Sequence, residues 1–132
     1  MSDEALKIIS DAMEALGISY AFMGEGLEED EEGNPIYPYY TGEYQEIEPM
    51  YESGQRESLF ILTGFSRTSW EVLENDKKKI EKYFPCDSGR MVITESGSAA
   101  AIFYLRSTPV RTTDAELKKI QINLDVKEWR VK

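Results

Sequence analysis

The residue types that most enzymes use for acid–base and nucleophilic chemistry are scarce in this chain. It has 132 residues and no histidine, which removes the commonest general base and every imidazole metal ligand. The single cysteine, Cys86, has no histidine or second cysteine beside which it would act as a nucleophile or metal ligand. An idle or buried thiol is the simplest interpretation, and a disulfide within the chain is excluded.

Carboxylates are the one reactive group present in quantity. A pair of carboxyl groups suited to catalysis should lie in an apolar cleft, whereas here the acids gather in polar segments, a pattern typical of a solvated surface. Residues 28–32 have the start of a calcium-loop spacing, but Tyr39 occupies the twelfth position, where a bidentate glutamate is needed. We expect no catalytic residue, no cofactor and no specific metal site; weak divalent binding stays open.

The acidic residues are concentrated in one segment. The chain carries 15 basic and 25 acidic residues, a formal charge of −10. Residues 24–57 hold eleven of the acids and one base, and residues 58–132 have a small excess of bases. Nucleic-acid binding through phosphates is not expected, because it needs clustered lysines and arginines. The acidic segment is either a solvated loop or one half of a head-to-tail surface that meets a mildly basic face.

Tyrosines follow the acidic run, and they are interrupted by Pro38 and Gly42, which is irregular for a core face. We expect about half of these tyrosines to pack on a sheet. Tyrosine beside small residues is also typical of contact surfaces, because the amphipathic ring tolerates water before binding. The candidate interface residues are therefore Tyr37, Tyr39, Tyr40, Tyr44, Glu28, Glu29, Asp30, Glu31 and Glu32.

An amphipathic helix is expected at the start of the chain. Apolar residues recur at intervals of three and four from Leu6 to Leu16. Ser2 or Asp3 can cap the start of this helix, and Gly17 is placed to end it. The polar face of the helix is mostly acidic, which disfavours a membrane-surface role. We therefore expect its apolar stripe to form part of the core.

The middle of the chain predicts short strands and long connections. Residues 18–23 alternate as a short strand does, and residues 24–35 are polar and glycine-punctuated, as in an exposed loop. Because Pro38 lacks an N–H donor, the tyrosine-rich stretch predicts an edge strand or an irregular extended segment. Residues 45–56 predict a second, mobile connection, and long connections inside a compact domain are often functional.

A central strand and a second helix are expected next. Residues 58–65 are apolar on both faces, as in a strand that is buried on both sides. Thr68 and Glu71 have the spacing of a capping box, which predicts a helix that runs to about Phe84 and is ended by Pro85.

Three more strands are expected in the last third of the chain. Residues 90–95 and 99–106 are separated by a short glycine turn and predict a hairpin, which Pro109 should end. Residues 116–126 alternate for a full strand. The residues beyond are out of phase with it, which implies a bulge or a change of partner near Lys127.

The whole pattern predicts a single α+β domain spanning residues 1–132, with residues 24–57 as a long acidic, tyrosine-rich region. The element order is α-β-β-β-α-β-β-β. We expect a mostly antiparallel sheet of about five to six strands with two helices packed on one face. No apolar run is long enough to span a membrane.

Two stretches of this sequence resemble a known family. They are residues 58–65 (SLFILTGF), which lead into the helix at Trp70, and residues 114–124 (DAELKKIQINL), which close on Val126-Lys127-Glu128-Trp129. With the element order, they resemble the small tail-terminator or tail-completion proteins of long-tailed bacteriophages and prophages, particularly those of Gram-positive hosts. The resemblance covers roughly residues 4–131, and the family has no catalytic signature.

The resemblance implies a structural role in the virion tail, with assembly in the host bacterial cytoplasm. Such proteins form a ring, usually a hexamer, on the finished tail tube, stop its growth and present the surface that joins the head. The implied partners are further copies of the chain, the tail tube protein and head–tail connector proteins, without sequence-specific nucleic acid or membrane. Acidic loops that face the ring's lumen would repel DNA.

Other classes of function stay open. The chain is alternatively another small head–tail connector or minor tail protein, or an acidic protein-binding module such as an inhibitor or DNA mimic. An enzyme subunit or small-ligand binder would need a defined apolar pocket with a few buried polar groups. A basic protein partner that competes with DNA would favour the acidic module.

Overall fold

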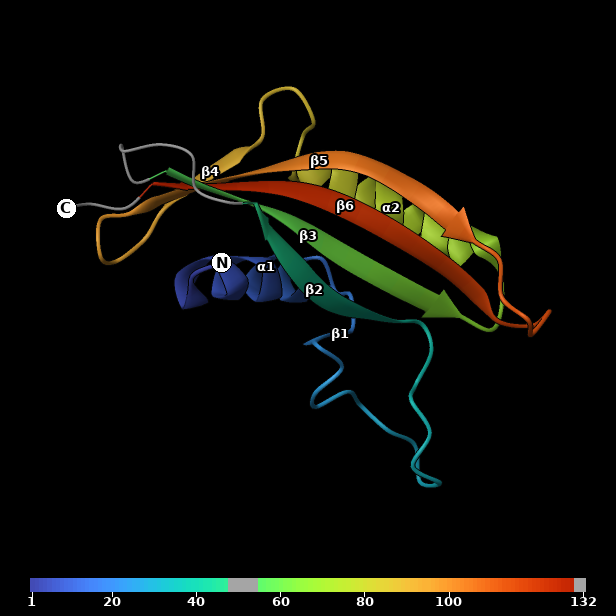
Figure 1. Cartoon of the computed structure of the whole chain (residues 1–132). Coiled ribbons are helices and arrows are strands. Elements are labelled where there is room, and N and C mark those ends of the chain that lie inside the picture. Colours follow the sequence, from blue (N-terminus) through green and yellow to red (C-terminus); the bar gives the residue numbers. More distant parts are fainter. Residues whose placement is uncertain (48–54, 130–132) are drawn as a thin grey trace.

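The computed structural model describes residues 1–47 and 55–129, which form two helices and six strands (Figure 1). In chain order these are α1 (Asp3–Ala15), β1 (Tyr20–Phe22), β2 (Tyr39–Ile47), β3 (Gln55–Ser66), α2 (Trp70–Tyr83), β4 (Arg90–Ile93), β5 (Ala99–Val110) and β6 (Lys118–Trp129). The strands form one sheet in the order β1-β2-β3-β6-β5-β4. Only the β1–β2 pair is parallel, so the sheet is mostly antiparallel, as predicted.

Both helices lie on the same face of the sheet, which confirms the predicted α+β arrangement (Figure 1). The amide of Ala5 donates to the hydroxyl of Ser2 over 3.1 Å, so Ser2 is the N-cap of α1. The helix turns its apolar stripe, which includes the fully buried Ile9 and Met13, toward the strands. In α2 the side chains of Leu73 and Ile80 are buried in the same way.

The hydrophobic core lies between the helices and the inward side chains of the sheet, many of them from β3 and β6. In β6 the predicted alternation is confirmed, because every second side chain from Ile120 to Val126 has no exposed surface. Phe60 and Leu62 of β3 are equally buried. The pair β3–β6 extends over the whole length of both strands, so the prediction that residues 58–65 form a central strand is also confirmed.

The tyrosine-rich stretch was expected to be an edge strand or an irregular extended segment, and each alternative holds for part of it. Residues 36–38 are irregular, and β1 pairs only with residues 40–42 of β2, so the rest of β2 is an edge of the described sheet. β2 begins after Pro38, so this residue removes no hydrogen bond from the ladder, and β1 pairs with β2 in parallel on its outer side. The predicted connection over 45–56 is wrong at its two ends. β2 extends to Ile47 and β3 starts at Gln55, and the residues between them lie outside the described part of the chain.

Pro109 does not end its strand, because β5 continues through it to Val110. Pro109 is opposite Ile120 of β6. On the other side of β5, β4 pairs only with residues 99–102, so the missing N–H of Pro109 falls where β5 is an edge strand. β6 meanwhile stays regular to Trp129, and the bulge predicted near Lys127 lies instead in β5, between Tyr104 and Arg106.

The predicted capping box at the start of α2 is not formed. The helix begins at Trp70 with Ser69 as the N-cap, and the Ser69 side chain accepts no capping hydrogen bond. Thr68 is engaged elsewhere, since its amide donates to the hydroxyl of Ser66 over 3.2 Å and the two hydroxyls lie 3.2 Å apart. The local pattern located the helix but placed its cap one residue early.

Candidate functional site

The acidic loop forms an arm that projects away from the sheet (Figure 1). We call residues 27–36 the acidic arm. Its end is a compact turn organised by Asp30, whose Oδ1 accepts the amides of Glu32 and Asn34, each over 2.9 Å. Backbone hydrogen bonds join the two sides of the arm, including Ile36 N to the Glu28 carbonyl at 3.1 Å. The five predicted acidic candidates, Glu28 to Glu32, are therefore exposed side chains on an ordered support.

The four candidate tyrosines separate into two pairs. Tyr40 is fully buried on the helix side, where burial and the nearby Asp76 carboxylate raise its pKa, so this residue belongs to the core and not to a contact surface. Tyr44 is half-buried and stacks on Phe22 with a centroid distance of 6.0 Å. The rings of Tyr37 and Tyr39 contact each other with their centroids 5.1 Å apart and their planes tilted by 52°.

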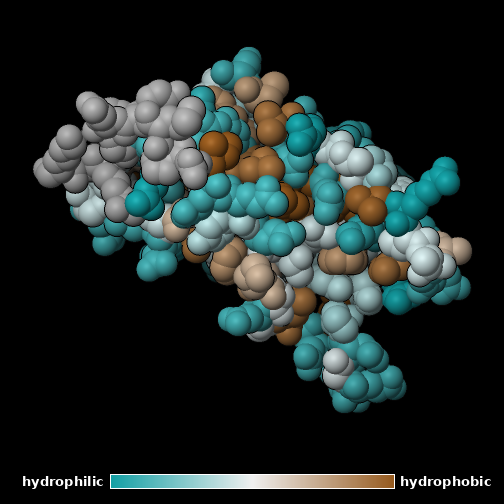
Figure 2. Space-filling model, viewed as in Figure 1, coloured by the Kyte–Doolittle hydropathy of each residue, from teal (hydrophilic) through white to brown (hydrophobic). Residues whose placement is uncertain are grey.

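The face of the sheet opposite the helices is covered by no other described element (Figures 1 and 2). We call this side the open face. Its members follow from the strand register and the alternation of burial. They are Tyr39, Thr41, Glu43, Gln45 and Ile47 of β2, Glu57, Leu59, Ile61, Thr63 and Phe65 of β3, Lys119, Gln121, Asn123, Asp125, Lys127 and Trp129 of β6, Ala99, Ala101, Phe103, Arg106, Thr108 and Val110 of β5, and Met91 and Ile93 of β4.

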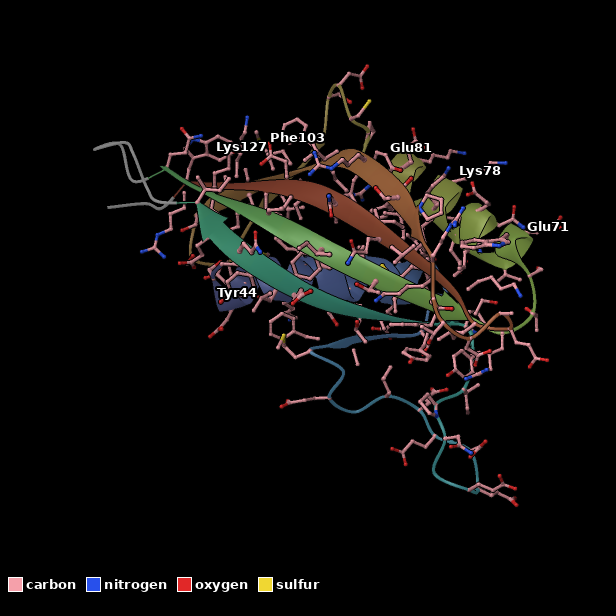
Figure 3. All side chains as sticks on the ribbon, turned by 45° about the vertical axis from the view of Figure 1, so that its right-hand side comes forward. Tyr44, Glu71, Lys78, Glu81, Phe103 and Lys127 are labelled. Atoms are coloured by element: carbon pink, nitrogen blue, oxygen red, sulfur yellow. The ribbon has the colours of Figure 1, made fainter. Side chains whose placement is uncertain are left out.

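Apolar and polar side chains are intermingled on the open face (Figure 2). At the end near the chain terminus, Met91, Ile93 and Ile47 are exposed by 66%, 74% and 48%. Lysines lie over aromatic rings, as Figure 3 shows for Lys127, whose Nζ is 5.4 Å from the Phe103 ring centroid. Such a surface combines apolar area with oriented charges, which is the composition of many protein contact sites.

The charges of the open face balance, although the chain as a whole is strongly acidic. The face carries three acidic and three basic side chains, which are Glu43, Glu57, Asp125, Arg106, Lys119 and Lys127. The acidic excess therefore lies elsewhere, in the arm and around the helices. A neutral face has no net repulsion toward another acidic protein.

Two carboxyl groups on the open face interact with each other. Burial, the hydrogen bond that protonated Asp125 donates to Glu57 and the negative charge of Glu57 together raise the pKa of Asp125 to about 6. Lys127, whose Nζ lies 4.0 Å from Asp125, acts in the opposite direction. The pair is a half-desolvated spot in the middle of the sheet, not an acid–base pair within a cleft.

The open face was not predicted from the sequence as a candidate site. The signal was present in the outward side chains of β3, since Leu59, Ile61 and Phe65 are apolar. That pattern led to the expectation of a strand buried on both sides, which is wrong in the described chain because only one side has a covering layer. Apolar residues without a second layer to cover them are the mark of this surface.

A cleft of about 530 Å³ lies between α1 and the β4–β5 hairpin. Charged side chains line much of it, including Glu4, Lys7 and Asp11. Hydrogen bonds from Thr94 and Ser96 lower the pKa of Glu4, so this carboxylate is ionised and serves as a link between helix and hairpin. Within residues 1–47 and 55–129, no three cysteine, aspartate or glutamate side chains gather as a metal site.

Comparison of the sequence with protein-family models finds no match, and a search of curated proteins finds none. In the part of the chain that the structure describes, neither helix is long and apolar enough to cross a bilayer. The open face and the acidic arm are therefore the two features from which a function can be inferred.

Proposed function

We propose that this chain is a non-enzymatic structural protein of a phage or prophage tail, of the tail-terminator type. The main support is the open face, which combines a balanced charge with apolar side chains and is covered by no other element within residues 1–47 and 55–129. A protein that joins a tail during assembly needs a surface of this kind, because its contact with the tail forms only then. An exposed apolar patch on a soluble fold is ordinarily such a site.

The arrangement of elements also agrees with the family that the sequence resembles. An N-terminal helix, a loop-rich middle, a helix after the central strand and a long final strand occur here as α1, the acidic arm, α2 and β6. In this proposal the chain closes into a ring of six copies on the tail tube, and its neighbours are the tube protein and the head–tail connector. It would assemble in the bacterial cytoplasm.

The acidic arm fits a ring through which DNA passes. Its five carboxylates are exposed and held on an ordered turn, so they would form a fixed negative patch wherever the arm points. Facing the lumen, such patches would repel the phosphates of the DNA and keep it from binding.

The proposal is tested by deleting the gene from the phage or prophage that carries it. We expect DNA-filled heads that remain unjoined, together with tail tubes of uncontrolled length, in electron micrographs of the lysate. Supplying the chain from a plasmid should restore joined virions. Normal virions from the deletion strain would contradict the proposal. Tails of normal length that lack one minor component would indicate that the chain is another small connector or minor tail protein and not a terminator.

The acidic arm also supports a second candidate, a module that binds a basic protein. In this second candidate function the exposed acidic side chains of the arm contact the partner, whereas in the tail role the open face of the sheet makes the contact. Replacing Glu28, Glu29, Glu31 and Glu32 with glutamine keeps Asp30 and the turn that it organises. If the variant still restores virions in the deletion strain, the arm's charge is not the essential contact.

A further inference from the structure

The charged side chains of the open face follow an ordered pattern. In one row across the sheet, Glu57 of β3 is directly opposite Lys127 of β6. Four residues further along the strands, Glu43 of β2 and Arg106 of β5 lie in one row, with the two central strands between them. In both rows the acid is on the β2–β3 half of the sheet and the base is on the β5–β6 half.

In these two rows the charge of the side chains changes from negative to positive across the line between β3 and β6. A two-fold axis along that line, parallel to the strands, places β3 of one copy over β6 of another and β2 over β5. Glu57 then faces Lys127 of the second copy, and Glu43 faces Arg106 of the second copy. Because a two-fold contact is self-complementary, each of these pairs forms twice.

We propose that the open face binds the open face of a second copy of this chain, as a two-fold dimer of sheets. Aligned sheets pack about 10 Å apart with their strands within about 30° of each other, a gap that glutamate, lysine and arginine side chains bridge from both sides. The two charged rows lie on either side of the row that contains Leu59 and Asp125. If one sheet is rotated by about 30° against the other around that central row, the opposite charges stay within reach of each other.

A second copy fits this surface better than other partners do. The charge of the open face sums to zero, so it offers no net attraction to a basic protein and none to nucleic acid. Another open face supplies the opposite charge at each charged position of the two rows. This charge complementarity follows from the register of the strands within the sheet and does not involve the acidic arm.

The size of the open face is sufficient for a stable dimer. Its four long strands, at spacings of about 4.8 Å and about 3.3 Å per residue, present roughly 600 Å² on each copy. Two such faces bury about 1,200 Å², the lower end of the range for specific interfaces. Half-buried apolar side chains, among them Leu59, Ile61 and Phe103, lie within this area and would lose their remaining contact with water.

The first test is the mass of the free chain. Native mass spectrometry and sedimentation over a concentration series should show a dimer that dissociates on dilution. Glu57→Lys places lysine over Lys127 of the second copy, and Lys127→Glu places two acids together. Each variant alone should weaken the dimer at least about tenfold, because like charges that face each other across an interface cost several kcal/mol.

The decisive measurement mixes the two variants. A Glu57→Lys chain presents two lysines at these positions and a Lys127→Glu chain presents two glutamates, so all contacts between them are complementary. An equimolar mixture should form a 1:1 heterodimer, recognised by its mass, as tightly as the unaltered chain forms its dimer. Heterodimer formation also shows that both variants are folded. Glu116→Lys, on the β5–β6 turn, is the matched control and should leave the dimer unchanged.

The inference would be overturned by a monomer at every concentration, by single variants that dimerise like the unaltered chain, or by a mixture that fails to pair. Species larger than two in the mixture would indicate a head-to-tail contact and would also overturn it. If the first pair of variants does not fold, Glu43→Arg and Arg106→Glu give the same test, since both side chains are exposed.

This inference does not depend on the proposed tail role, and the two fail separately. A dimer in solution with normal virions from the deletion strain would support the contact and contradict the function. A monomer in solution with unjoined heads would do the reverse. If both hold, the dimer is the form in which the free chain covers the open face until the tail replaces the second copy.

Discussion

At the scale of single residues, Asp125 shows how the uncovered face affects stability. Its carboxyl group lies among Leu59 and Phe103 and shares a hydrogen bond with Glu57, so the folded chain favours its protonated form and raises its pKa to about 6 from 3.8. Between these two values the folded chain binds more protons than the unfolded chain. The contribution of Asp125 to stability therefore falls as the pH rises from about 4 to about 6, and stays constant above.

Asp125→Asn tests this dependence, because asparagine cannot ionise and can donate a hydrogen bond to Glu57. We expect the variant to match the unaltered chain near pH 4 and to exceed it by about 1 kcal/mol above pH 6.5, a value reduced for the partial exposure of the site. The free energy of unfolding by urea, measured in dilute solution from pH 4 to 8, checks this. Glu116→Gln controls for the loss of one charge. A difference that does not vary with pH would contradict the assignment.

Contacts between single residues also explain why the sequence predicted that some tyrosines are buried but not which ones. Tyr40 is buried because it lies opposite Gly64 of β3, and a Cβ at Gly64 would overlap the Tyr40 ring. The sequence contains both residues, but their proximity depends on the register of β2 against β3. A pattern of tyrosines predicts that some will pack inward, and only the pairing of strands decides which.

At the scale of elements, the acidic arm is a locally stabilised unit. Its turn depends on the two hydrogen bonds that Asp30 Oδ1 accepts, and its side chains are exposed. Asp30→Ala should therefore loosen the arm and leave the sheet intact. Since each hydrogen bond contributes about 0.5–1.5 kcal/mol, amide exchange at Gly33 and Ile36 should rise roughly tenfold.

The matched control for Asp30→Ala is Glu31→Ala, which removes the same charge from the same arm but leaves the two Asp30 hydrogen bonds in place. Both variants should keep the free energy of unfolding of the unaltered chain within about 0.5 kcal/mol. Exchange that rises equally in both variants would show that charge, not the Asp30 hydrogen bonds, holds the arm. A large loss of global stability would show that the arm is part of the cooperative fold.

Elements with a strong period were predictable, whereas their ends were not. The stripe of α1 and the alternation of β6 each follow from the local sequence, because burial on one face imposes the period. The ends depend on neighbours that are distant in the chain. Pro109 stays in β5 because β4 is too short to reach it, and the cap of α2 is displaced because Thr68 contacts Ser66.

At the scale of the whole molecule, the α+β class was predictable from the order of elements, but the exposed sheet face was not. The sheet order places β6, the last strand, between β3 and β5, so residues far apart in the sequence form each charged row. Composition reveals the acidic excess and its segment. Only the topology shows that this excess leaves one face of the molecule neutral.

The same topology brings the two ends of the described fold together at Glu128, a carboxylate that is only 7% exposed. Its Oε1 and Oε2 accept the amide of Ser2 at 3.2 and 3.4 Å, and Oε1 also accepts the Ser2 hydroxyl. Ser2 caps α1, so the acid of the last strand lies at the positive end of the first helix. The contact therefore joins the helix layer to the sheet.

Glu128→Ala should lower the free energy of unfolding by about 2–3 kcal/mol, because hydrogen bonds to a charged group and its interaction with the helix dipole are lost together. Glu128→Gln keeps an acceptor of the same shape and should cost about 1 kcal/mol. Urea denaturation gives both values, and amide exchange in the first turn of α1 should rise more than exchange in β3. Equal losses from Glu128→Gln and Glu128→Ala would assign the stability to the charge alone. A loss no larger than that of Glu116→Ala would show that Glu128 does not join the two layers, and that packing of Ile9 and Met13 alone holds α1 on the sheet.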